Sequence, residues 1–209
     1  MFNGLIRHFG RSRSFDGKSL AISTTLQARL GDSVAVNGAC LSVVKIISDG
    51  FIVELSSQSA QVLALQNYQA GELLHLEPAL KYGEQIHGHL MQGHIDGIGV
   101  IERIAPLSVG KDFYIQLPSE LMSLMAHKGS IGVDGVSLTI SALYERGIRL
   151  SIIPLTLKDT LFGSYKQGRR VHIESDLLAR YTKRILECRS LASANALSWE
   201  QAELYTRLF

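Results

Sequence analysis

The chain has 209 residues, 46% of them hydrophobic and 19% charged, which suits one large folded domain or two of about 100 residues and argues against disorder. A formal net charge of +2, without a basic stripe interleaved with aromatic residues, argues against a nucleic-acid partner, and no apolar run approaches the roughly 18 residues of a membrane-spanning helix. Cys40 and Cys188 do not suggest a disulfide framework, so we expect a reducing, cytoplasmic environment.

The first residues, MFNGLIRHFGRSRSF, are predicted to form a β-strand followed by a basic loop. The segment SVAVNGACLSVVKII then alternates around Asn37–Gly38, a pair that favours a two-residue hairpin turn with positive φ at both positions. Further short strands are expected at FIVELSS, LLHLE, FYIQL, IRLSIIP and RVHIES. Many short strands at this spacing favour small closed barrels, which have no exposed sheet edge.

The barrel prediction applies twice, because three blocks of sequence recur in the same order. In the first copy the blocks are FNGLIRHFG, DSVAVNGACLSVV and LQNYQAGELLHLE, which begin at Phe2, Asp32 and Leu65. Their counterparts are MQGHIDGIG, GSIGVDGVSLTI and FGSYKQGRRVHIE, which begin at Met91, Gly129 and Phe162. Asp134–Gly135 supplies the hairpin turn of the second copy. We place the boundary near Tyr82–Gly83, so that residues 1–84 and 85–176 form the two barrels.

The C-terminal segment, residues 177–209, is predicted to be helical. In DLLARYTKRILECR the apolar residues recur at helical spacing, at Leu177, Leu178, Tyr181 and Ile185. Residues 198–201, SWEQ, are a capping-box start for a second helix that ends at Phe209. The apolar stripe of the first helix needs a partner, which is either the barrels of its own chain or another copy of the chain.

Strand alternation divides each hairpin into an inner and an outer face. The side chains expected inside the barrels are Leu41, Val43, Leu138 and Ile140. The polar side chains that then face outward are Cys40, Ser42, Ser137 and Thr139. Two matching polar rows on related barrels suggest two related ligand sites, although an ordinary solvated strand face has the same pattern.

The stretch HGHLMQGH places His87, His89 and His94 within a short span. On a strand, His87 and His89 share a face, a spacing that can serve zinc, but no acidic or sulfur ligand follows at a familiar interval. Proton transfer suits these histidines better, because the pKa of histidine lies near neutrality. A purely structural role fits the spacing equally well.

The stretches MFNGLI, NGACLSV, DGVSLTI, GHLMQGHIDG and HIESDLLARY closely resemble the riboflavin synthase family, in the family's order from Met1 to about Arg184. The resemblance implies a mainly β fold of two similar six-stranded Greek-key barrels, with a C-terminal α-helix that assembles a homotrimer. It also implies a reaction in which two molecules of 6,7-dimethyl-8-ribityllumazine exchange a four-carbon unit. The products are riboflavin and 5-amino-6-(ribitylamino)uracil, which makes this the final step of riboflavin biosynthesis. No metal or organic cofactor is implied, and lumazine synthase is a candidate partner.

The motif match also implies site residues. In the first barrel these are Gly4, Leu5, Ile6, Cys40, Leu41, Ser42, Glu54, Leu55, Ser56, Ser57, Gln58 and Ser59. In the second barrel they are Gly93, His94, Ile95, Ser137, Leu138, Thr139, Ser151, Ile152, Ile153, Pro154, Leu155 and Thr156. Lys128 matches the family's lysine that reaches the ligand of a neighbouring subunit. In the family, an active site joins the first barrel of one subunit to the second barrel of another.

The reaction suggests roles for a few of these residues. His94 is the first candidate for removing a proton from the 7-methyl group of one lumazine. Ser137, Cys40 and Ser33 are candidates for activating the other lumazine, assisted by Asp176. Orienting the two rings face to face should supply much of the rate. The donor and acceptor lumazines play different roles, which explains why the first copy has Cys40 at the position where the second copy has Ser137.

The sequence departs from the family mainly in the first barrel. SSQSAQVL stands where the family tends towards Pro-Glu-Thr and a further threonine, so Gln58 replaces a glutamate that would bind the sugar chain. Lumazine-binding antenna proteins are the main alternative, since they resemble the same family but bind one chromophore without turnover. They depart from the patterns that this chain keeps at 40–42 and 88–94, which favours the enzyme.

Overall fold

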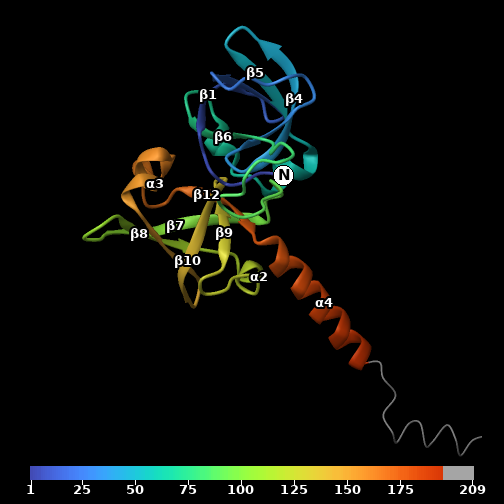
Figure 1. Cartoon of the computed structure of the whole chain (residues 1–209), viewed down its shortest axis with the longest axis vertical. Helices are drawn as coiled ribbons and strands as arrows, with labels where there is room; N and C mark the ends of the chain where they lie inside the picture. Colours follow the sequence, from blue (N-terminus) through green and yellow to red (C-terminus); the bar gives the residue numbers. More distant parts are fainter. Residues whose placement is uncertain (195–209) are drawn as a thin grey trace, which may run out of the picture.

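The computed structural model describes residues 1–194, and most of them form two closed antiparallel β-barrels (Figure 1). The first barrel contains β1 (His8–Phe15), β2 (Ser19–Thr24), β3 (Ser33–Val36), β4 (Ala39–Ile47), β5 (Gly50–Glu54) and β6 (Leu73–Pro78). The second contains β7 (Gly97–Pro106), β8 (Lys111–Gln116), β9 (Ser130–Val133), β10 (Val136–Tyr144), β11 (Gly147–Ile152) and β12 (Arg170–Ser175). The first runs β1-β2-β5-β4-β3-β6, and the equivalent strands of the second have the same circular order. The predicted pair of six-stranded barrels is confirmed.

Short helices lie at equivalent places in the two barrels. Between β5 and β6 stand α1 (Ser57–Val62) and the 3₁₀ helix η1 (Leu65–Tyr68). Between β11 and β12 stand α3 (Pro154–Asp159) and the 3₁₀ helix η2 (Leu161–Ser164). A further short helix, α2 (Ser119–Met122), lies between β8 and β9, and α4 (Leu177–Ala194) follows β12.

Each barrel encloses its own apolar core, as the strand alternation predicts. On β4, Leu41 and Val43 are buried in the first core, while Cys40 is half-buried and Ser42 is exposed on the other face. On β10, Ile140 is buried in the second core, and the partly buried Leu138 packs against it. Each inward branched side chain removes apolar surface from water, which stabilises the barrel by about 1.5–3 kcal/mol when burial is complete.

The two hairpin turns have the predicted backbone conformation and touch each other. Asn37 and Gly38 have φ of 46° and 84°, and Asp134 and Gly135 have φ of 45° and 81°. A Cβ atom on Gly38 would lie 2.6 Å from the backbone nitrogen of Gly135. The turns therefore need glycine for a second reason, because any side chain would separate the barrels at this contact.

The prediction of a basic loop after an initial strand is wrong. Residues 2–7 precede the first strand, and the basic segment is itself β1. Along β1 the exposed Arg11 and Arg13 alternate with the buried Gly10 and Ser12. Period-two alternation lets a strand hold arginines on its outer face while small residues face the core, so charge alone did not mark a loop.

The predicted first C-terminal helix is confirmed as α4, which extends away from both barrels (Figure 1). Of the apolar side chains described on it, Leu177 is half-buried, but Leu178 is 74% exposed, and Tyr181, Ile185 and Leu186 are also exposed. The predicted second helix, from Ser198 to Phe209, lies outside the described residues. None of the helices described here is both long enough and apolar enough to cross a membrane.

Candidate active site

Two equivalent segments of backbone cross between the barrels and pair with each other. The backbone N–H of Phe2 donates to the carbonyl of Met91 at 2.7 Å, and the N–H of Met91 donates back to Phe2 at 3.1 Å. Beyond this bridge, the N–H of Ser137 donates to the carbonyl of Gly4 at 2.8 Å. The N–H of Cys40 donates to the carbonyl of Gly93 at 2.9 Å in the same way. Each crossing segment therefore extends an edge of the other barrel's hairpin.

Two buried glutamates hold the crossing segments in place. The carboxylate of Glu77, on β6, accepts from the N–H groups of Asn3 and Gly4 at 2.7 and 3.0 Å. Glu174, on β12, accepts from the equivalent N–H groups of residues 92 and 93 at 2.7 and 3.1 Å. Burial raises the pKa of Glu77 to about 7, against the lowering effect of these hydrogen bonds, and burial also raises the pKa of Glu174.

Glycine is required where each segment meets the hairpin. Gly93 has φ of +77°, and a Cβ there would lie 2.5 Å from Cys40 Cβ and 2.7 Å from Cys40 N. Gly4 has φ of +74° and would clash in the same way with Ser137. The shared glycines of the duplicated sequence therefore have a physical cause, because no side chain fits between the crossing backbone and β4 or β10.

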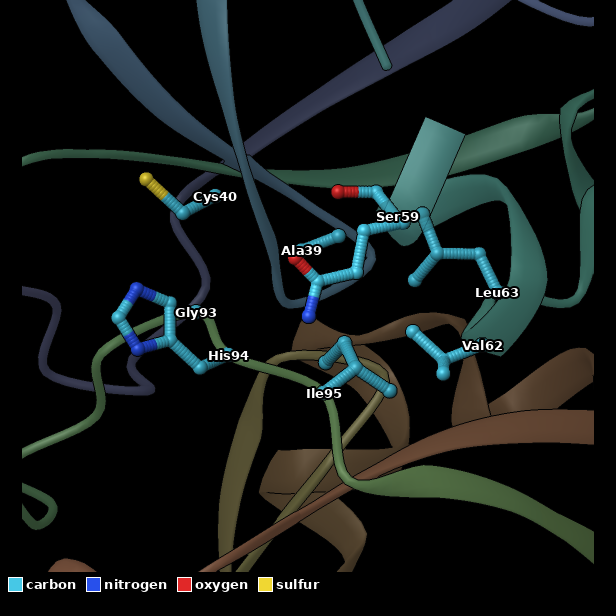
Figure 2. Close-up of a pocket in the computed structure, with 9 residues that line it drawn as sticks. Ala39, Cys40, Ser59, Val62, Leu63, Gly93, His94 and Ile95 are labelled. Atoms are coloured by element: carbon cyan, nitrogen blue, oxygen red, sulfur yellow. The ribbon is translucent and has the colours of Figure 1, made fainter. Parts of the chain in front are cut away.

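A pocket of about 430 Å³ opens beside Cys40. It is lined by Ala39, Cys40, Gln58, Ser59, Val62, Leu63, Gly93, His94 and Ile95. Figure 2 shows Cys40 and His94 on one side of this pocket, with Val62, Leu63 and Ile95 on the other. We call it the Cys40 pocket. Its size and its mixture of apolar walls with a few polar groups suit a small organic ligand.

A second pocket, of about 540 Å³, occupies the equivalent position beside Ser137. Its lining is Gly4, Leu5, Ile6, Arg7, Phe9, Val136, Ser137, Leu155, Thr156, Lys158, Asp159 and Thr160. We call it the Ser137 pocket. The duplication relates Gln58 of the Cys40 pocket to Leu155 of the Ser137 pocket, so the backbone positions correspond while the side chains differ.

The structure corrects the expected grouping of these segments. Residues 93–95 complete the pocket of the first barrel, and residues 4–7 complete the pocket of the second. The two apolar cores show the same exchange of segments, since Ile6 is buried in the core of the second barrel and Ile95 packs against the core of the first. His94 and Ser137 therefore lie in different pockets, although the motif match to the family placed both in the second barrel. The reason is the crossing of the two segments, which a comparison of the copies does not reveal.

Ser137 has a histidine partner that the sequence analysis did not assign to the site. His89 Nδ1 lies 2.7 Å from Ser137 Oγ, and the buried His89 Nε2 has no hydrogen-bond partner among the residues that the structure describes. Burial lowers the pKa of His89, and the negative charge of Asp176 opposes this shift. The His-rich stretch was the available signal, but its spacing pointed equally to metal binding. In the described part of the chain, no three histidine, cysteine, aspartate or glutamate side chains are grouped to hold a metal ion.

His94 is held from the base of α4. Arg180 Nη2 donates to the carbonyl of His94 at 2.7 Å and to Asp96 Oδ2 at 2.9 Å. Asp96 Oδ2 in turn accepts from the backbone and the hydroxyl of Ser175, each at 2.7 Å. This arginine connects the exposed helix to the wall of the Cys40 pocket. Helical periodicity did not single it out, because it lies off the apolar stripe.

The remaining candidate residues line neither the Cys40 pocket nor the Ser137 pocket. Those that contribute to the two barrel cores are Leu41, Leu55, Leu138 and Ile152. Those on the polar strand faces or exposed surface are Ser33, Ser42, Glu54, Lys128, Thr139 and Ser151. Those at helix starts are Ser56, Ser57, Ile153, Pro154 and Asp176. The sequence match therefore includes residues that face the pockets, residues of the two cores and residues of the exposed surface.

Comparison with known proteins identifies the family. A family model described as a lumazine binding domain matches twice, over residues 3–79 and 92–176. The riboflavin synthase of Photobacterium phosphoreum is 32% identical over 194 residues, which cover 89% of this chain and 89% of that protein. The riboflavin synthase of Bacillus subtilis (strain 168) is 34% identical over 193 residues, covering 89% of this chain and 90% of that protein. The chain belongs to the riboflavin synthase family.

Solved structures share the fold of this riboflavin synthase family member. LumP complexed with riboflavin matches with a TM-score of 0.74 and 22% identity, over 84% of this chain and 99% of that chain. LumP complexed with 6,7-dimethyl-8-(1'-D-ribityl) lumazine matches with a TM-score of 0.72 and 21% identity over the same shares. At this identity the likeness is evidence for the fold. Membership of the riboflavin synthase family confirms the resemblance that the sequence motifs indicated.

Proposed function

We propose that the chain converts two molecules of 6,7-dimethyl-8-ribityllumazine into riboflavin and 5-amino-6-(ribitylamino)uracil, by transfer of a four-carbon unit. The observation that carries the proposal is the pair of related but unequal pockets. A reaction between two copies of one molecule needs two sites of similar shape, since the substrates are identical. It also needs different chemistry at each site, since one substrate donates carbon atoms and the other accepts them.

The side chains divide in a way that suits these two roles. Cys40 and His94 face one pocket, while Ser137 faces the other with His89 behind it. A histidine can take a proton from the acidic 7-methyl group of a lumazine, because the resulting charge is delocalised into the ring. A hydroxyl or thiol can add to, or polarise, the electrophilic edge of the second ring. The atoms of two lumazines equal those of the two products, so the transfer balances without another substrate.

The proposal includes assembly as a homotrimer through α4. Its exposed apolar side chains, among them Leu178, Tyr181 and Ile185, are evidence that the helix has a partner outside its own chain. In such a trimer, the Cys40 pocket of one subunit faces the Ser137 pocket of a neighbour and brings the two rings together. Lys128 is exposed, as a residue that reaches a neighbouring subunit's ligand must be. Residues 1–84 and 85–176 are then the two lumazine-binding units.

The test is turnover by the purified chain. We expect 6,7-dimethyl-8-ribityllumazine to give riboflavin and 5-amino-6-(ribitylamino)uracil in equal amounts, in the presence of a metal chelator, followed by absorbance and chromatography. Sedimentation at several concentrations measures the oligomeric state, and deleting the segment from residue 177 should produce monomers. Tight lumazine binding without riboflavin would refute the proposed reaction and favour a binding protein. No binding would refute the ligand as well.

A further inference from the structure

Two buried histidines outside the pockets connect the barrels. His75 on β6 and His172 on β12 occupy equivalent positions in the duplication, and both are fully buried. Each ring packs against a tyrosine of the opposite barrel. The ring centroids of His172 and Tyr68 lie 5.7 Å apart, and those of His75 and Tyr165 lie 6.3 Å apart. Neither histidine lines a pocket, so the proposed reaction does not use them directly.

Both ring nitrogens of each histidine bind the backbone of the other barrel. His172 Nδ1 lies 2.8 Å from the carbonyl of Asn37, and His172 Nε2 accepts from the N–H of Ala64 at 2.8 Å. A carbonyl only accepts and an amide N–H only donates, so the ring must be neutral with its proton on Nδ1. Burial lowers the pKa of His172, which favours this form. An apolar residue would leave both backbone groups unpaired in the interior.

His75 repeats the arrangement in the opposite direction. Its Nδ1 lies 2.8 Å from the carbonyl of Asp134, and its Nε2 accepts from the N–H of Leu161 at 2.8 Å. Burial lowers the pKa of His75 to about 4, so this ring is also neutral at physiological pH. The duplication thus produces two crossed bridges, each with a backbone donor and a backbone acceptor.

The backbone groups that the two histidines bind lie next to residues that line the pockets. Ala64 follows Val62 and Leu63 of the Cys40 pocket, and Leu161 follows Thr160 of the Ser137 pocket. The other end of each bridge is the hairpin turn before Cys40 or Ser137. The structure assigns His172 to positioning the Cys40 pocket and His75 to positioning the Ser137 pocket, each from the opposite barrel. The nature of the ligand rests on the proposed function, while the positioning of the two pockets by the histidines rests on the hydrogen bonds described above.

Thiol reporters can test the crossed assignment, because the chain has two cysteines. Cys188→Ser leaves Cys40 as the thiol of one pocket. Cys40→Ser, Cys188→Ser and Ser137→Cys together move the thiol to the other pocket. Each reporter is alkylated with iodoacetamide, with and without riboflavin, in chains carrying His172→Phe or His75→Phe. Phenylalanine supplies an aromatic ring without nitrogen atoms and so removes both hydrogen bonds between the barrels.

We expect His172→Phe to raise the riboflavin concentration that half-protects Cys40 about tenfold, and to change protection at position 137 less than twofold. His75→Phe should produce the opposite pattern. A merely structural role would shift both reporters alike, which would overturn the inference. An effect on the pocket of the histidine's own barrel would overturn it too.

Conservative variants keep the test valid where phenylalanine prevents folding. The side chain of His172→Gln can place an acceptor near the Nε2 position and so keep the bond to Ala64, whereas that of His172→Asn reaches the Nδ1 position alone. We expect riboflavin to protect Cys40 at a lower concentration in the glutamine variant than in the asparagine variant. The reverse order contradicts the assignment of His172 to the Cys40 pocket. Riboflavin that protects neither thiol in the unsubstituted reporters would refute the proposed function. The ligand-free alkylation rates still test the crossed pattern in that case, since they report the pocket wall itself.

Discussion

Replacing Gly93 with alanine tests whether the crossing segment determines the Cys40 pocket. At φ of +77°, any residue with a Cβ loses about 1–2 kcal/mol to the left-handed conformation. The new Cβ would also lie 2.5 Å from Cys40 Cβ and 2.7 Å from Cys40 N, contacts that no side-chain rotation relieves. The segment must therefore move and lengthen the 2.9 Å hydrogen bond from Cys40 N, which adds about 1 kcal/mol. We expect a total loss of about 2–3 kcal/mol.

Gly31 provides the matched control, because it has φ of +85°, and, its own atoms and its two chain neighbours apart, no described atom lies within 4 Å of the position that a Cβ would take there. Gly31→Ala should lose about 1–2 kcal/mol from the conformation alone. Urea unfolding measures both variants, and turnover of 6,7-dimethyl-8-ribityllumazine is followed in parallel. Gly93→Ala should lose turnover because His94 moves with the segment, while Gly31→Ala should retain it. Equal losses of stability and activity in the two variants would refute the close-approach argument.

Three further substitutions test the stability of the fold and the separation of the pockets. Tyr165→Phe removes a 2.6 Å hydrogen bond to the buried carboxylate of Asp134, so it should lower the free energy of unfolding in urea by about 2–3 kcal/mol. Tyr68→Phe, whose hydroxyl donates to a backbone carbonyl, should lower it by about 1 kcal/mol, and equal losses would contradict a charged acceptor. The raised pKa of Glu77, about 7, means that the folded chain binds a proton which the unfolded chain releases above about pH 4.5. Stability relative to Glu77→Gln should therefore fall by roughly 3 kcal/mol as the pH rises from 4 to 8, and a flat difference would contradict the shift. Ser137→Ala should lower turnover about tenfold with unchanged riboflavin protection of Cys40, and loss of that protection would refute separate pockets.

The sequence was sufficient to predict what depends on local pattern. Asn37–Gly38 and Asp134–Gly135 specify their turns through backbone conformation, and alternation places Leu41 and Ile140 inside the barrels. The internal match of the two copies also predicted that each strand of one barrel has an equivalent in the other. These features depend on neighbouring residues along the chain or on the relation between copies.

The path between the barrels was not predictable in the same way. Gly4 and Gly93 align with each other, and the alignment is equally consistent with each segment remaining on its own barrel. The crossing depends on Glu77 and Glu174, whose carboxylates fix segments that are distant in sequence. The contact between His89 and Ser137 depends on the same path. Long-range placement of this kind needs coordinates, because no periodicity along the chain encodes it.

The two pockets share a frame made of backbone and differ in the side chains that fill it. Crossing glycines, hairpin turns and histidine bridges engage backbone N–H and carbonyl groups, which every residue except proline has, so substitutions other than proline on the polar faces leave this backbone arrangement intact. Asn37 and Asp134, at the contact between the two turns, also share a backbone interaction and differ in their side-chain partners. The side chain of each accepts from a backbone N–H. Asp134 also accepts from the hydroxyl of Tyr165, whereas Asn37 Nδ2 has no partner within residues 1–194. Divergence of Cys40 from Ser137 therefore costs the fold little. The duplicated barrel in this way offers two pockets of related backbone shape whose side chains differ.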